Sequence, residues 1–131
     1  MEYDPASTVA LVLLAHGSRD PRWAEPFVEV TRRVQARVPG VTVTLAFLES
    51  MTPDLSAAVG EQVARGARTV AVVPIFLGQG GHVRADIPRL VEAIGRAHPG
   101  VTLTVAQAAG EAPEVLEALA AYCAAQVVPR R

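Results

Sequence analysis

The chain has 131 residues, of which half are apolar but only 5% aromatic, and its formal net charge is -1. This length suits a single domain over residues 1–131, with one core built from Ala, Val and Leu. The near-neutral charge and the dispersed arginines argue against nucleic acid as a partner, and no apolar run approaches the roughly 20 residues that a membrane span requires.

Strand-like and helix-like segments alternate along the whole chain. Apolar or β-branched runs predict strands at residues 9–14, 41–48, 69–76 and 101–105. Proline and glycine signals delimit the predicted helices, which begin near Asp20, Thr52, Val83 and Pro113 and end near Val38, Arg65, Ala97 and Val127. The resulting βαβαβαβα order predicts an α/β fold: a four-stranded parallel sheet with helices on both faces.

Two histidines and one carboxylate follow consecutive strands of this predicted sheet. His16 follows the first strand, Glu49 the second and His82 the third, so all three are expected at the carboxyl edge, where such sheets bind ligands. They converge if the first strand lies between the second and the third. His98 follows a helix and is expected at the opposite edge, capping that helix or meeting solvent.

Two imidazoles and a carboxylate form a mixed nitrogen and oxygen donor set. Such a set suits Co²⁺, Fe²⁺, Ni²⁺ or Zn²⁺ and leaves coordination positions open, as exchange or catalysis requires. A single histidine in a loop is more often solvated or hydrogen-bonded than a metal ligand. The convergence of His16, Glu49 and His82 therefore carries the metal hypothesis.

Glycines and arginines surround the predicted site. Gly17 follows His16, and Gly80 and Gly81 precede His82. These glycines supply the positive φ angles of tight turns, let a large flat ligand approach the backbone, or do both. Arg19 and Arg84 lie in or just after the same loops and suit the carboxylates of an anionic substrate, although most helix-surface arginines are simply solvated. The aromatic pair Trp23 and Phe27 is expected to pack the first helix.

Cys123 is the only cysteine, which excludes an internal disulfide. Its Ala-Ala-Tyr-Cys-Ala-Ala setting predicts a buried helical position with a structural role. No basic segment precedes the first apolar run, so no signal peptide is expected and the protein is expected in the cytoplasm.

Three ordered motifs resemble the sirohydrochlorin chelatase family of the CbiX and SirB type. The resemblance covers roughly residues 11–90, and its strings are Ala15-His16-Gly17-Ser18-Arg19-Asp20-Pro21, Ala46-Phe47-Leu48-Glu49, and Pro74-Ile75-Phe76-Leu77 followed by Gly81-His82-Val83 and Asp86-Ile87-Pro88. It implies a lyase that inserts cobalt, ferrous iron or nickel into the tetrapyrrole sirohydrochlorin, for cobalamin or siroheme biosynthesis. The divalent metal is then a substrate, and no organic cofactor is expected.

The resemblance places the family's metal-binding histidines at His16 and His82 and its acidic partner at Glu49. It also implies a homodimer, as does the shallowness expected of a single strand-end cleft. One departure lies near Gly110 and Glu111, where family members commonly carry a Leu-Gly-x-His-Pro segment and this chain has no histidine. Glu111 is at best a weak substitute oxygen ligand.

Two other functions fit some of these residues. A histidine phosphatase is suggested by His16-Gly17 after the first strand and by Arg19 as a phosphate ligand, but that chemistry requires an arginine directly before the histidine, where this chain has Ala15. A metal or tetrapyrrole carrier has the same ligands without turnover, and the sequence does not separate it from an enzyme.

Overall fold

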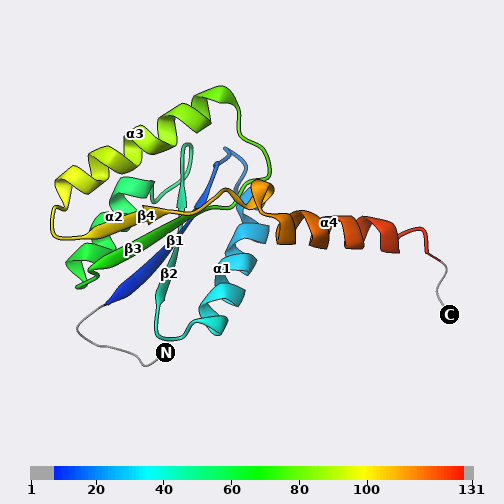
Figure 1. The fold of residues 1–131 in the computed structure, drawn as a ribbon, viewed down its shortest axis with the longest axis horizontal. Coiled ribbons are helices and arrows are strands. Elements are labelled where there is room, and N and C mark those ends of the chain that lie inside the picture. The colour runs from blue at the N-terminus through cyan, green and yellow to red at the C-terminus, as the bar shows by residue number, and fades with distance from the viewer. Residues whose placement is uncertain (1–7, 129–131) are drawn as a thin grey trace.

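The computed structural model describes residues 8–128 as a β-sheet with flanking helices (Figure 1). Its elements are, in chain order, β1 (Val9–Ala15), the 3₁₀ helix η1 (Pro21–Ala24), α1 (Glu25–Arg37), β2 (Thr42–Phe47), α2 (Leu55–Ala64), β3 (Thr69–Pro74), α3 (Gly81–Ala97), β4 (Thr102–Val105), the 3₁₀ helix η2 (Ala109–Glu111) and α4 (Pro113–Ala125). The predicted α/β order is confirmed.

The four strands form one parallel sheet in the order β2-β1-β3-β4. In the register, Leu13 of β1 pairs with Leu45 of β2 on one side and with Val73 of β3 on the other. The first strand therefore lies between the second and the third, as convergence of the predicted site required. Because the strands are parallel, the loops that follow β1, β2 and β3 all emerge at one edge.

Helices α2 and α3 cover one face of the sheet and form the larger core with it. Alternate residues of the central strands point into this core, and Val12, Val70 and Val72 have no exposed surface. The helices contribute Leu55 and Val59 from α2, and Ile87 and Ile94 from α3.

Helix α1 covers part of the other face, so helices lie on both faces as predicted. A smaller cluster forms there, in which Trp23 and Phe27 pack against Phe47. The Trp23 and Phe27 ring centroids are 4.6 Å apart, which confirms that these aromatics pack the first helix. The first helical segment begins at Asp20 as predicted. The Asp20 side chain accepts a hydrogen bond from the Arg22 backbone N–H and so caps η1.

Helix α4 projects away from the rest of the structure (Figure 1). Its main contacts are with η2 directly before it, and every residue from Leu116 to Val128 is exposed. The prediction that Cys123 is buried is wrong, because its thiol lies on this projecting helix. An alanine-rich, apolar helix context predicts burial only if the helix packs on its own domain, and α4 does not.

One predicted boundary also differs at the site. The third helix begins at Gly81 rather than Val83, which places His82 in the first turn of α3 instead of in the preceding loop. Pro88 lies inside this helix, as predicted. Over residues 8–128, none of the helices combines the length and the apolar character needed to cross a bilayer.

Candidate metal centre at the carboxyl edge of the sheet

A cavity of about 520 Å³ opens at the carboxyl edge of the sheet. Four of its lining residues carry groups that bind metals or protons: His16, Glu49, His82 and Asp86. The others are apolar, namely Leu48, Val83, Ile87 and Leu90. Polar groups that converge in an otherwise apolar hollow are typical of a ligand site.

His16 and Glu49 contact each other at the mouth of this cavity. The distance from His16 Nε2 to Glu49 Oε1 is 3.1 Å, and the two side chains are 46% and 64% exposed. The backbone sets this pairing, because the β1–β2 ladder continues past the strands: Leu48 N–H donates to the Ala15 carbonyl and Glu49 N–H to the His16 carbonyl. An exposed imidazole and carboxylate in contact can jointly hold a cation or pass a proton.

Gly17 makes the close approach of these two loops possible. Its φ is +106°, in the region that side chains rarely adopt, and a Cβ there would lie 1.8 Å from the Glu49 carbonyl oxygen. The turn chemistry considered for the site glycines therefore applies at Gly17.

His82 and Asp86 face the same cavity from α3. They lie four residues apart, one turn along the helix, so both side chains project from one side of it. The sequence argument did not select Asp86 as a site residue, although the spacing from His82 was a signal for it. Within residues 8–128, no three His, Cys, Asp or Glu side chains lie close enough to form a metal cluster. His16 and Glu49 thus form one pair, and α3 carries the remaining donors separately.

Gly80 and Gly81 are not required by turn geometry. Neither has a positive φ in the glycine region, and a Cβ added to either would meet no atom within 4 Å. Gly80 is the N-cap of α3 and Gly81 its first residue. Their backbone is open, and the close approach of a flat ligand to these two glycines stays a prediction.

Glu111 is bound elsewhere and does not line the His16 cavity. Its Oε1 accepts a hydrogen bond from Gln79 Nε2 at 2.8 Å and lies 3.0 Å from Arg84 Nη2. Gly110 packs so tightly on the same loop that a Cβ there would lie 1.6 Å from the Leu77 carbonyl oxygen. Gly110 and Glu111 therefore hold the loop that contains Gln79 in place. Sequence reasoning missed this role, because nothing in the spacing of Gln79 and Glu111 indicates their contact.

The two predicted substrate arginines differ in their surroundings. Arg19 is exposed in the loop after β1, near His16 in the chain. Arg84 is also exposed, but its guanidinium pairs with Glu111 in an adjoining cavity of about 230 Å³. Both lie at the carboxyl edge of the sheet.

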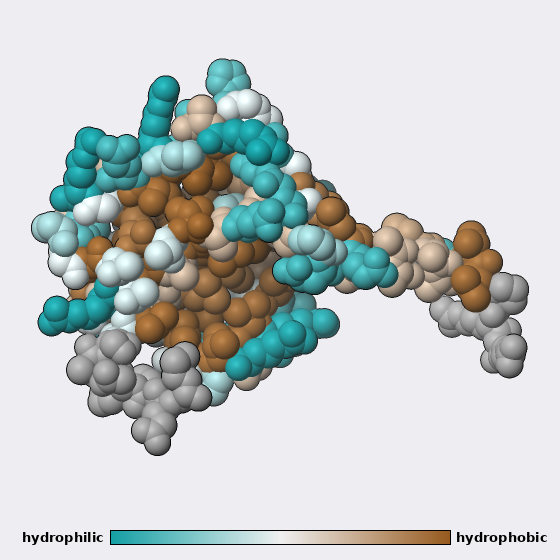
Figure 2. All heavy atoms as spheres, viewed as in Figure 1, coloured by the Kyte–Doolittle hydropathy of each residue, from teal (hydrophilic) through white to brown (hydrophobic). Residues whose placement is uncertain are grey.

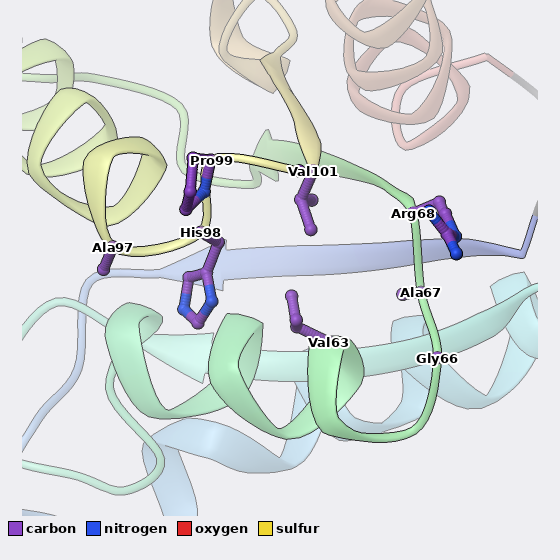
Figure 3. A pocket seen from close by; sticks show the side chains of 9 residues that line it. Val63, Gly66, Ala67, Arg68, Ala97, His98, Pro99 and Val101 are labelled. Carbon is purple, nitrogen blue, oxygen red and sulfur yellow. The ribbon is translucent and has the colours of Figure 1, made fainter.

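His98 lies at the opposite edge, as predicted. It is the C-cap residue of α3 and lines a separate cavity of about 410 Å³. Figure 3 shows its imidazole on one side of this cavity and Arg68 at the far side, with apolar Val63 and Val101 between them. Among residues 8–128, no other histidine and no carboxylate lines it, so the described part of the cavity offers a poor donor set for a metal.

The sequence profile of the CbiX family matches residues 10–125. The chain belongs to the CbiX family. In fold, it is similar to the putative cobalamin (vitamin B12) biosynthesis CbiX protein of Marinobacter aquaeolei VT8, with a TM-score of 0.81 and 30% identity over 91% of this chain and 97% of that one. It also superimposes on SirB from Bacillus subtilis with Fe³⁺, with a TM-score of 0.77 and 26% identity, over 93% of this chain and 48% of SirB.

Curated relatives of this CbiX chain carry the name sirohydrochlorin cobaltochelatase. The protein of Methanocaldococcus jannaschii is 38% identical over 89 residues, 68% of this chain and 62% of that protein. The protein of Saccharolobus solfataricus is 34% identical over 83 residues, 63% of each chain. The aligned segments thus span just over three fifths of these relatives.

Proposed function

We propose that this CbiX chain is a chelatase that inserts a divalent metal ion into sirohydrochlorin. The observation that carries the proposal is the His16–Glu49 pair, 3.1 Å apart, in a cavity that His82 also lines at the carboxyl edge of the sheet. Relatives named sirohydrochlorin cobaltochelatase support the substrate, as does the structural similarity to SirB with Fe³⁺.

Metal insertion requires the exchange of two protons for one cation. The macrocycle loses two pyrrole N–H protons as its nitrogens bind the metal, and the metal sheds its water ligands. In the proposed mechanism His16 and His82 hold the incoming metal, and each imidazole nitrogen that releases the metal to the macrocycle then accepts a pyrrole proton. Glu49 binds the cation or relays the second proton through its contact with His16.

The metal-binding side chains lie apart from one another. This arrangement suits a metal ion that the protein passes on and does not retain. Residues 8–128 contain no compact three-ligand cluster, and the His16–Glu49 pair is exposed. A loosely held cation passes to a stronger ligand without first breaking a closed coordination shell. Four pyrrole nitrogens are such a ligand.

The substrate would lie over the open backbone of Gly80 and Gly81, where no side chain obstructs a flat ring. Arg19 and Arg84 would bind its peripheral carboxylates. Asp86, one turn from His82, is a further candidate for the metal path. Cobalt or ferrous iron is the proposed metal, nickel is the alternative, and the absence of an organic cofactor stays a prediction.

A homodimer and a cytoplasmic location complete the proposal. The His16–Glu49 pair is exposed on the surface of one chain, and a second subunit would cover it. Sedimentation at micromolar concentration tests the dimer. A fully active monomer would contradict it.

The decisive experiment mixes the protein with sirohydrochlorin and Co²⁺, Fe²⁺ or Ni²⁺ and follows the absorption of the macrocycle. A chelatase accelerates the spectral change far beyond the uncatalysed rate, with many turnovers per protein. A carrier binds metal or tetrapyrrole at a stoichiometric ratio without turnover. That result would replace the enzymatic proposal with the carrier. Hydrolysis of a phosphate ester with no chelation would favour the phosphatase.

A further inference from the structure

The segment that leads from β3 to His82 is rich in glycine and largely exposed. Residues 77–81 read Leu-Gly-Gln-Gly-Gly, and of these only Gln79 is partly buried. A Cβ added to any of the three glycines would meet no atom within 4 Å, so close packing does not select one backbone conformation there. His82 follows directly, in the first turn of α3. The position of its imidazole therefore depends on what else holds this segment.

The loop between β4 and α4 supplies the contacts that hold it. Gly110 N–H donates to the Phe76 carbonyl at 3.1 Å. One residue later, Glu111 Oε1 accepts a hydrogen bond from Gln79 Nε2 at 2.8 Å. This second bond is partly buried and has a charged acceptor, and both features make a hydrogen bond stronger than one in water between neutral groups. It joins the middle of the glycine-rich segment to a residue 32 positions away in the chain.

Glu111 has a firm support of its own. Its backbone N–H donates to the carbonyl of Ala108, a buried residue that is 5% exposed, and Ala106 N–H continues the sheet by donating to the Val72 carbonyl. Figures 1 and 2 show α4 leaving the body of the molecule directly after η2. The loop that carries Glu111 therefore takes its support from the sheet.

Arg84 is a second and weaker partner of Glu111. Its Nη2 lies 3.0 Å from Glu111 Oε1, but its side chain is 60% exposed, and exposed ion pairs contribute little. The Arg84 backbone already belongs to α3, where its N–H donates to the Gly80 carbonyl. The hydrogen bond to Gln79 is thus the contact of Glu111 that acts on the segment before the helix.

This bond lies next to the metal cavity and not in it. Gln79 and Glu111 line the cavity of about 230 Å³, His82 lines the one of about 520 Å³, and Ile87 of α3 lines both. The His16–Glu49 pair is held by the loops after β1 and β2, whereas His82 is carried by α3. The relative position of the two halves of the site therefore depends on where α3 begins.

We propose that Glu111 is a positioning residue for metal insertion, which holds His82 in place opposite the His16–Glu49 pair through its hydrogen bond with Gln79. In this role Glu111 touches neither the metal nor the macrocycle. The inference rests on the proposed chelatase function. Transfer of a metal between ligands requires the donors in register with the acceptor, and a displacement of about 1 Å can cost about 100-fold in rate.

The kinetic test compares Glu111→Ala and Gln79→Ala with the wild type in metal insertion. Each substitution removes one end of the bond, so we expect kcat to fall about 10- to 100-fold while the KM for sirohydrochlorin stays within about threefold. The Tm should change little. Because both residues act through one bond, the double variant should be no slower than the slower single variant.

Two further variants separate positioning from a general effect of the charge. Glu111→Gln keeps an oxygen that accepts the Gln79 hydrogen bond, so it should retain most of the wild-type rate. Glu117→Ala is the matched control, because it removes the same carboxylate from an exposed position on α4. We expect it to insert metal at the wild-type rate.

Amide hydrogen exchange, measured by NMR without metal or macrocycle, tests the physical cause. The informative amides are those of Arg84 and Gly110, which donate to the Gly80 and Phe76 carbonyls of the glycine-rich segment and its start. In Glu111→Ala we expect both to exchange at least about tenfold faster, while the amides of β1 and β3 keep their wild-type rates.

The outcomes distinguish this inference from the proposed function. A wild type that inserts no metal would contradict the chelatase proposal. With an active wild type, the positioning role would be overturned by unchanged exchange at Arg84 and Gly110 in Glu111→Ala, or by a kcat equal to that of Glu117→Ala. A Glu111→Gln variant as slow as Glu111→Ala, or a double variant slowed by the product of the two single effects, would also overturn it.

Discussion

At the scale of single residues, the His16–Glu49 contact is the feature that most limits which reactions the site can perform. The location of both residues at the carboxyl edge was predictable from the sequence, because all parallel strands end there, whereas their contact depends on β1 and β2 being neighbours. The contacts of Glu111 with Gln79 and Arg84 were not predictable, since they depend on how two loops fold over each other.

Replacing Glu49 by Gln tests the role of its charge. The amide keeps the shape and a hydrogen bond to His16 but loses the charge that attracts a cation and the site that takes up a proton. We expect metal insertion to fall about 10- to 100-fold, with a raised KM for the metal. Initial rates at varied metal concentration check this. An unchanged rate at low metal would exclude Glu49 from the reaction.

Gly17 is predicted to be irreplaceable for structural reasons. Gly17→Ala combines a strained φ with a Cβ 1.8 Å from the Glu49 carbonyl oxygen. We expect the free energy of unfolding to fall by about 2 kcal/mol or more in urea titrations. Gly78→Ala is the control, because a Cβ there meets no atom within 4 Å and the φ is ordinary. Equal stability of the two variants would contradict the described turn.

At the scale of the elements, the strands were predicted to within about two residues at each end. Continuous runs such as Val9–Leu14 and the β-branched run at 69–73 leave few alternatives for buried parallel strands. The position of helix α4 was also predicted from the sequence, but the way it packs was not. Periodicity identifies the apolar side of a helix but not the surface that this side covers. The prediction that Cys123 is buried was wrong for this reason.

A second prediction at this scale concerns substrate binding by Arg84, together with the loop and helix that carry it. If its guanidinium binds a substrate carboxylate, Arg84→Ala raises the KM for sirohydrochlorin roughly three- to tenfold and leaves kcat near normal. The loss of its exposed pair with Glu111 costs little stability. Arg96→Ala is the control, because Arg96 pairs with Glu92 near the other end of α3. An unaltered KM would remove Arg84 from the substrate site.

A paired carboxylate on helix α1 predicts how the thermal stability of the protein changes at acid pH. Hydrogen bonds from Arg32 and Arg33 lower the pKa of Glu29 from 4.5 to about 2. A lowered pKa means that the folded state favours the carboxylate, so this stabilisation is complete above pH 4.5 and is lost as the pH falls toward 2. The Tm of Glu29→Gln should therefore lie slightly below that of the wild type at pH 6, and the gap should close toward pH 2. A gap that widens in acid would contradict the assignment.

At the scale of the whole molecule, the sheet separates two groups of histidines. His16 and His82 lie at the carboxyl edge with Glu49, while His98 caps α3 at the other edge. The strand order could not be read from the sequence alone, yet it decides that His16 lies between the other two strand ends. It therefore decides whether a site exists.

The central claim is tested most directly by measuring sirohydrochlorin metallation in three histidine variants. We expect His16→Ala and His82→Ala to lose at least about 99% of the insertion rate with little change in Tm, because both side chains are exposed at the edge of the core. His98→Ala should keep a rate near that of the wild type. If His98→Ala lost as much activity as His16→Ala at equal stability, the site would not lie at the carboxyl edge of the sheet.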